Sequence, residues 1–199
     1  MRRTFFRSAL ALAAASVPAV AQAHVGAGAT HGFAHGLAHP VGGLDHVLAM
    51  TLVGVLAFQM GGRAIWMVPA AFVGVMMLGG ALGAAGVDLP FVETGIALSV
   101  VVLGAMVAFR AKASAAAAAT IVGLFAVFHG HAHGAEMPAT GSGLSYGAGF
   151  VLATIGLHGA GVALGYVLHL LTETRARLLT QGVGGGAAIL GLMIMAGVA

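Results

Sequence analysis

The sequence predicts an all-α membrane protein, a bundle of six transmembrane helices that follows a cleaved signal peptide. Of its 199 residues 60 % are hydrophobic and only 7 % are charged, whereas soluble domains carry roughly a quarter charged residues. Six apolar segments are long enough to cross about 30 Å of hydrocarbon. Short connections separate these segments, and short connections are typical of antiparallel helix bundles.

The composition excludes several classes of function. The eight Lys and Arg residues are scattered, whereas a nucleic-acid-binding protein gathers its basic residues on one face. The chain has no cysteine, so it has neither disulfides nor a thiolate metal site. No phosphate-binding loop of the ATPase type occurs, so ATP does not drive the chain directly. Ten histidines outnumber both the basic and the five acidic residues, and this surplus indicates a function based on imidazole.

Residues 1–23 have the three parts of a secretory signal peptide. Positive charge comes first, an apolar stretch follows over 9–20, and the small residues at 21–23 form a cleavage site. Cleavage after Ala23 would make His24 the new N-terminus on the periplasmic side. An uncleaved first helix is the alternative interpretation.

Residues 24–43 are rich in Gly, Ala and His and have no helical periodicity. This composition predicts a flexible periplasmic arm. Four histidines are spaced along it, and they either capture metal outside the membrane or belong to a solvated linker. The sequence leaves both interpretations open for His24, His31, His35 and His39.

The remaining chain, residues 44–199, is predicted to form the transmembrane domain. Its glycines include runs such as 182–186, and small residues allow membrane helices to approach closely. The six predicted spans are Leu44 to Met60, Ala64 to Gly86, Phe91 to Phe109, Ser114 to His133, Leu144 to Leu171, and Leu178 to Val198.

The charged residues between the spans predict the orientation in the membrane. Alternate connections carry every Lys and Arg of the mature chain, and the opposite connections carry Asp88 and Glu136 without a base. Because basic loops stay in the cytoplasm, both mature termini are predicted to be periplasmic, in a multi-pass protein of the bacterial inner membrane. The cytoplasmic basic residues are Arg63, Arg110, Lys112, Arg175 and Arg177.

A first polar cluster lies where the first predicted span begins. Asp45 and His46 are adjacent there, and Met50 lies one turn deeper on the same face as His46. Pro40 and the glycines after it would let the chain fold back and bring His39 to the pair. Imidazole and carboxylate suit divalent nickel, cobalt, copper and zinc, although Met50 is also explained by packing.

A second cluster lies at the end of the fourth predicted span, on the same side of the membrane. His129 and His133 are four residues apart, and Glu136 follows three residues later on that face. The same spacing forms metal chelates on other helices. His131 is predicted to point the other way, towards solvent.

Three further polar residues are candidates of lower rank. His158 lies near the middle of the fifth predicted span among small residues, and a histidine at that depth indicates a deeper ligand or a relay. Glu93 begins the third span and would either add negative charge to an entrance or face lipid headgroups. His169, near the cytoplasmic end, is either an exit residue or an interfacial one.

Two motifs in this chain resemble those of the HupE/UreJ family of nickel and cobalt permeases. The first is His-Pro-x-x-Gly-x-Asp-His at 39–46, and the second is Phe-His-Gly-x-Ala-His-Gly-x-Glu at 128–136. The resemblance covers essentially the whole mature chain. It implies secondary transport of a transition metal into the cytoplasm, with the metal choice left open. The metal residues that it implies are His39, Asp45, His46, His129, His133 and Glu136.

The resulting functional prediction is a permease and not an enzyme. It needs no resident cofactor, since the divalent metal is its substrate, and its partners are that metal and the lipid bilayer. Transport by uniport and transport coupled to protons both stay open, as does assembly into a homo-oligomer. The alternatives are a b-type haem membrane protein, since paired histidines can ligate haem iron, and a periplasm-facing metal sensor or storage protein.

Overall fold

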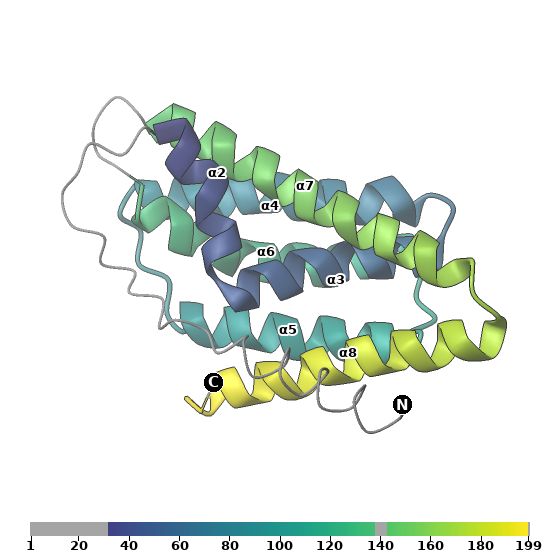
Figure 1. The fold of residues 1–199 in the computed structure, drawn as a ribbon. Coiled ribbons are helices and arrows are strands. Elements are labelled where there is room, and N and C mark those ends of the chain that lie inside the picture. The colour runs from purple at the N-terminus through teal and green to yellow at the C-terminus, as the bar shows by residue number, and fades with distance from the viewer. Residues whose placement is uncertain (1–31, 138–142, 199) are drawn as a thin grey trace, which may run out of the picture.

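The computed structural model describes residues 32–137 and 143–198. The predicted signal peptide and His24 lie outside these ranges. Within the described ranges every regular element is an α-helix (Figure 1). The helices are α2 (Gly32–Gly42), α3 (Leu44–Met60), α4 (Ala64–Ala84), α5 (Val92–Ala108), α6 (Ala115–Ala135), α7 (Gly143–His169) and α8 (Glu173–Met195).

Helices α3 to α8 occupy the six apolar segments, so the predicted all-helical class is confirmed. The largest difference in bounds is at α8, which begins at Glu173 and not at Leu178. Four helices, α4, α6, α7 and α8, are each long and apolar enough to cross a membrane. Helix α5 has only 17 residues, roughly 25 Å of helix, and α3 qualifies only together with α2 as a bent pair. Six complete spans therefore stay a prediction.

The predicted flexible arm is wrong over residues 32–42, which form α2. This helix lies along the N-terminal part of α7 (Figure 1). At Gly36 an added Cβ would overlap the carbonyl oxygen of Tyr146, and at Gly149 it would overlap that of Phe33. The glycines that suggest flexibility in the sequence therefore allow two helix backbones to touch. Helix α2 is thus part of the helix bundle.

A sharp bend at Gly43 separates α2 from α3, whose axes differ in direction by 84°. Gly43 is the N-cap of α3 and has an extended backbone. A Cβ at this position would lie 2.8 Å from the Asp45 carboxylate and 3.1 Å from Nδ1 of His46. The bend therefore directs α2 across the end of the bundle, and the glycine leaves room for the two polar side chains that follow.

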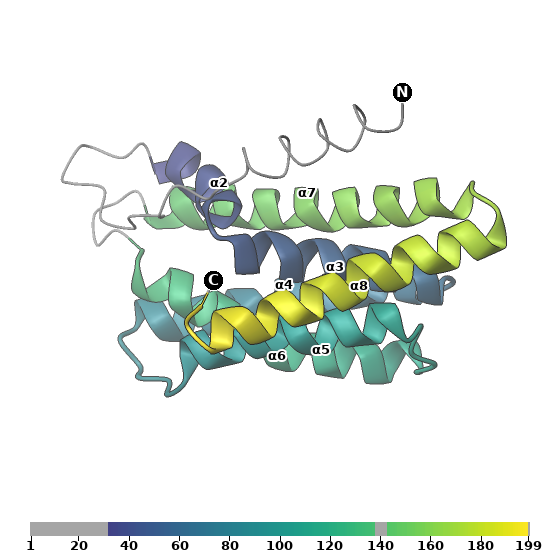
Figure 2. The ribbon, with the colours of Figure 1, turned by 60° about the horizontal axis from the view of Figure 1, so that its bottom comes forward.

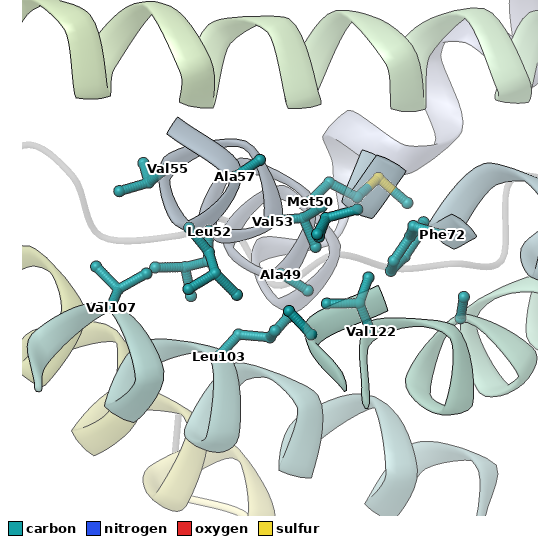
Figure 3. Packing of buried hydrophobic residues seen from close by; sticks show 14 of the residues in the cluster. Ala49, Met50, Leu52, Val53, Val55, Ala57, Phe72, Leu103, Val107 and Val122 are labelled. Atoms are coloured by element: carbon teal, nitrogen blue, oxygen red, sulfur yellow. The ribbon is translucent and has the colours of Figure 1, made fainter. Parts of the chain in front are cut away.

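Helix α3 is the central element of the bundle. It packs against α7, α5 and α4, while α4 pairs closely with α6 and α5 with α8 (Figures 1 and 2). Its buried residues include an unbroken run over 52–57, which is expected for a helix enclosed on nearly every side. Figure 3 shows its apolar side chains against Phe72, Leu103 and Val122 of the neighbouring helices. In the first turn of α3 His46 is already buried, whereas Leu44 is 51 % exposed.

Candidate metal centre

Histidines from three helices meet at the end of the bundle where α3 begins and α6 ends. The ring centroids of His46 and His133 are 4.4 Å apart, and those of His46 and His129 are 4.6 Å apart. His39 of α2 adds its ring 4.7 Å from that of His133. The structure thus brings the two sequence motifs into one cluster. His39 joins this cluster by its contact with His133 of α6.

The outer part of this cluster consists of His39, His133 and Glu136. One ligand atom from each lies within 4.8 Å of the others, and the described residues hold no second group of three His, Asp or Glu as compact. Nε2 of His39 donates to Oε2 of Glu136 at 2.7 Å. This hydrogen bond holds the pKa of Glu136 below its ordinary value against the opposing effect of partial burial. His133 is buried and the Glu136 side chain is 55 % exposed, so the group joins the surface to the interior.

Asp45 and His46 form a hydrogen-bonded pair within the cluster. Oδ1 of Asp45 accepts from Nδ1 of His46 at 2.8 Å and from the His46 backbone N–H at 2.7 Å. A neutral imidazole that donates through Nδ1 has its lone pair on Nε2. Nε2 of His46 is buried and has no hydrogen-bond partner among the described residues. The carboxylate therefore orients the ring and leaves a nitrogen ready for a metal, as outer-shell carboxylates do in metal sites.

His129 is the most deeply buried member of the cluster, with none of its surface exposed. Its Nε2 lies 2.9 Å from the hydroxyl of Ser99 on α5, while its Nδ1 has no partner in the described chain. Ser99 carries no signal in the sequence, because a lone serine in an apolar helix gives no pattern. Only the register between α5 and α6 identifies it.

His35 and Tyr146 border the outer group. The His35 ring lies 5.3 Å from that of His39 and 5.4 Å from that of Tyr146, which is itself 5.8 Å from His39. The Tyr146 hydroxyl and both ring nitrogens of His133 are buried without a partner in the described ranges. His35 lies in the segment predicted to be a flexible arm, and Tyr146 is not among the residues predicted for the site, since only the contact between α2 and α7 joins them to the cluster.

His158 lies deeper in the bundle, on the other side of one aromatic ring. The Phe72 centroid is 5.5 Å from that of His129 and 5.1 Å from that of His158. His158 is 3 % exposed, and neither of its ring nitrogens has a partner among the described residues. The structure thus places the predicted deeper residue next to the cluster, with Phe72 between them.

Three other candidates do not join the cluster. Met50 packs in the apolar core beside Phe72 (Figure 3). Glu93 is exposed in the first turn of α5 and has no hydrogen bond or ion pair within the described parts of the chain. His131 does point away from His129, but the predicted solvent exposure is wrong. It is buried because α6 packs on α4, and its Nε2 donates to the carbonyl of Val87 at 2.6 Å.

The opposite end of the bundle carries a polar cavity of about 600 Å³ between α3, α7 and α8. Arg110, Glu173 and Arg177 line it, together with Gln59 and His169. The ring of His169 is exposed and lies 6.1 Å from that of Phe58. The histidine cluster and these basic residues therefore occupy opposite ends of the bundle.

The sequence model of the family described as HupE / UreJ protein matches residues 11–194. Protein HupE from Rhizobium leguminosarum bv. viciae is 46 % identical over 186 residues, which cover 94 % of this chain and 95 % of that protein. No solved structure matches the chain.

Proposed function

The chain belongs to the HupE / UreJ family, whose members are transporters or accessory proteins and not enzymes, and we propose that it imports a divalent transition metal from the periplasm to the cytoplasm. Nickel or cobalt is the proposed substrate. The observation that carries the proposal is the set of buried imidazole nitrogens without hydrogen-bond partners on His46, His129 and His133. Buried polar atoms are nearly always satisfied in folded proteins, and a bound cation would satisfy these.

Capture begins at the outer group of His39, His133 and Glu136. Its carboxylate is half exposed and ionised at neutral pH, so it attracts a hydrated cation. Two imidazoles and a carboxylate then replace bound water, a donor set that suits first-row divalent metals. Metal binding would displace the proton that His39 shares with Glu136.

His133 passes the metal inward because it belongs to both parts of the cluster. It contacts His39 on the outer side and His46 on the inner side. The Asp45 carboxylate supplies negative charge next to His46 and holds its ring. The deeper step leads from His129 past Phe72 to His158, and the metal leaves at the polar cavity of the opposite end.

The arrangement of charge supports the proposed orientation in the membrane. Arg110 and Arg177 line the cavity opposite to the histidine cluster, and basic residues mark the cytoplasmic side. In this orientation α3 to α8 make the six spans, with α2 folded over the periplasmic end of α3. The signal peptide is cleaved, and both mature termini are periplasmic. The inner membrane is the proposed location.

The membrane potential is sufficient to drive this import. Moving a divalent cation inward across 100 mV gains roughly 4.6 kcal/mol, twice the value for a single charge. This corresponds to about a thousandfold accumulation, since each 1.4 kcal/mol is tenfold. Uniport therefore meets the energetic requirement, and coupling to protons is a variant of the same proposal.

The geometry does not favour the haem alternative. The rings of His46 and His129 lie edge to face with centroids 4.6 Å apart, which leaves no space for a porphyrin plane between them. His133 likewise contacts both His39 and His46.

Uptake of radiolabelled nickel and cobalt into proteoliposomes with an inside-negative potential tests the proposal. We expect the wild-type protein to accumulate the metal and to lose this accumulation when the potential is removed. The variants His46→Ala and His129→Ala should not accumulate it. Binding of metal without any uptake would instead establish the sensor or storage alternative. Absence of both binding and uptake would refute the metal function.

A further inference from the structure

The hydroxyl of Ser99 makes two short contacts inside the bundle. Its Oγ is 2.6 Å from the carbonyl oxygen of Ile96, one turn earlier in α5, and 2.9 Å from Nε2 of His129 on α6. Ser99 has no exposed surface, so water does not compete for either contact. The hydroxyl has a single proton, so Oγ can donate in only one of the two contacts.

Only one arrangement of protons satisfies both contacts. The carbonyl of Ile96 is an acceptor, so the hydroxyl must donate its proton there; otherwise two oxygens would face each other at 2.6 Å without a hydrogen. Oγ must then accept from His129, which places a proton on Nε2. A neutral imidazole carries one proton, so the Nδ1 of His129 holds the lone pair. That nitrogen is the one that is buried without a partner in the described chain.

We propose that Ser99 is a positioning residue that fixes His129 as the Nε2–H tautomer and so presents Nδ1 to the transported metal. The part that concerns the metal rests on the proposed function, whereas the tautomer itself is a property of the metal-free protein. Asp45 has the complementary effect on His46, since it takes up Nδ1–H and leaves Nε2 for the metal. The two neighbouring rings thus offer opposite nitrogens, each selected by the side chain that hydrogen-bonds to the other nitrogen of the ring.

A buried helix hydroxyl that donates to the preceding turn is also a common structural feature, and the chain contains a matched example. Thr154 of α7 has no exposed surface and donates to the carbonyl of Phe150 at 2.9 Å. Its other contact is the sulfur of Met76, not an imidazole. Removal of this hydroxyl therefore measures the effect of losing a buried helix hydroxyl and its hydrogen bond to the preceding turn, without the loss of a contact to an imidazole.

The experiment uses the full-length protein in detergent, as wild type, Ser99→Ala, Ser99→Thr and Thr154→Val. Nitrogen-15 NMR of the metal-free protein, with the His129 signals assigned by their loss in His129→Gln, reports which ring nitrogen is protonated. Calorimetric titration with Ni²⁺ measures affinity. We expect a single Nε2–H tautomer in the wild type and in Ser99→Thr, and mixed tautomers in Ser99→Ala. The Kd of Ser99→Ala for Ni²⁺ should rise about 10- to 100-fold. Thr154→Val should keep both the His129 tautomer and the Kd of the wild type.

An Nδ1–H tautomer of His129 in the wild-type protein would overturn the inference, even if Ser99→Ala did not fold. It would also be overturned if Ser99→Ala kept both the tautomer and the affinity of the wild type, or if Thr154→Val weakened binding equally. A wild-type protein that binds no nickel would refute the proposed function. In that case the tautomer measurement alone still decides the role of Ser99.

Discussion

His46 and His133 lie edge to face with ring centroids 4.4 Å apart, although they belong to different helices, α3 and α6. His133 also contacts His39 of α2, with centroids 4.7 Å apart. One imidazole therefore links the half-exposed outer group to the buried inner histidines. This shared position makes His133 the residue whose loss should affect both steps of metal entry.

The first prediction concerns His133. Replacement by alanine should lower nickel uptake by more than about tenfold, because ligand loss should exceed the effect of losing an outer-shell partner. The matched control is His131→Gln, two residues away on α6. The glutamine amide can still donate to the Val87 carbonyl that His131 binds, so uptake should stay near the wild-type rate. Equal uptake by wild type and His133→Ala would contradict the proposed route.

Asp45 provides a test of orientation against direct ligation. The side-chain oxygen of Asp45→Asn can still accept from Nδ1 of His46, whereas Asp45→Ala has no acceptor. If Asp45 mainly orients His46, nickel affinity should fall in the order wild type, Asn, Ala, with the alanine variant weaker by about 10- to 100-fold. The same loss in both variants would indicate that the carboxylate itself binds the metal. Titration calorimetry measures the three affinities.

Gly43 should be intolerant of a side chain, unlike its neighbour Gly42. A Cβ at 43 would lie 2.8 Å from Oδ1 of Asp45, whereas a Cβ at 42 meets no atom within 4 Å. We therefore expect Gly43→Ala to displace the Asp45–His46 pair and reduce uptake severalfold, while Gly42→Ala transports normally. Uptake assays at matched protein levels make the comparison. Equal rates for the two variants would show that the pair tolerates displacement.

Uptake should decrease as the external pH falls from 7.5 to 5.5 at a fixed membrane potential. A protonated imidazole cannot bind a metal, so protons compete with the metal for the histidine cluster. Glu136 is not the cause in this range, because its hydrogen bond with His39 lowers its pKa below 4.5. The pKa of Glu136 is lower in the folded protein than in the unfolded chain. The hydrogen bond with His39 therefore stabilises the fold at any pH above the pKa that Glu136 has in the unfolded chain, and this stabilisation is lost only as the pH falls through the pKa of the folded protein.

Glu136→Gln should therefore reduce uptake at every pH and leave the midpoint of the pH profile unchanged. Initial rates in proteoliposomes with a clamped potential provide the measurement. A steep rise in uptake below pH 6 would count against direct coordination by histidine.

The contact between α4 and α6 depends on Gly130. A Cβ there would overlap the carbonyl oxygen of Met76, whereas a Cβ at Gly156 meets nothing within 4 Å. Gly130→Ala should destabilise the bundle by about 1–3 kcal/mol, the usual cost of overpacking, and Gly156→Ala should not. Thermal unfolding in detergent compares the two variants. A Gly130→Ala protein as stable as wild type would show that the two helices can separate at no cost.

Local sequence patterns were enough to predict α3 to α8, apart from the early start of α8 at Glu173, and the residues that could meet at one end. Hydropathy sets where an apolar helix runs, and this is a local property of the chain. The spacing of His129 and His133 places them on one helix face without further information. Motifs at 39–46 and 128–136 also sufficed to indicate the family that the comparisons confirm.

The pairing of these residues depends on how the helices pack against one another. Residues 32–42 resemble a flexible arm in composition, yet they form α2 because glycines of α2 and α7 let the backbones touch. The partners of His46 and His129 are Asp45 and Ser99, and the second of these lies on another helix. Burial and hydrogen bonding between helices depend on their relative register, which no local pattern encodes. The sequence therefore supplies the imidazoles, and the packing of α5 and α6 selects which nitrogen of His129 is left without a partner.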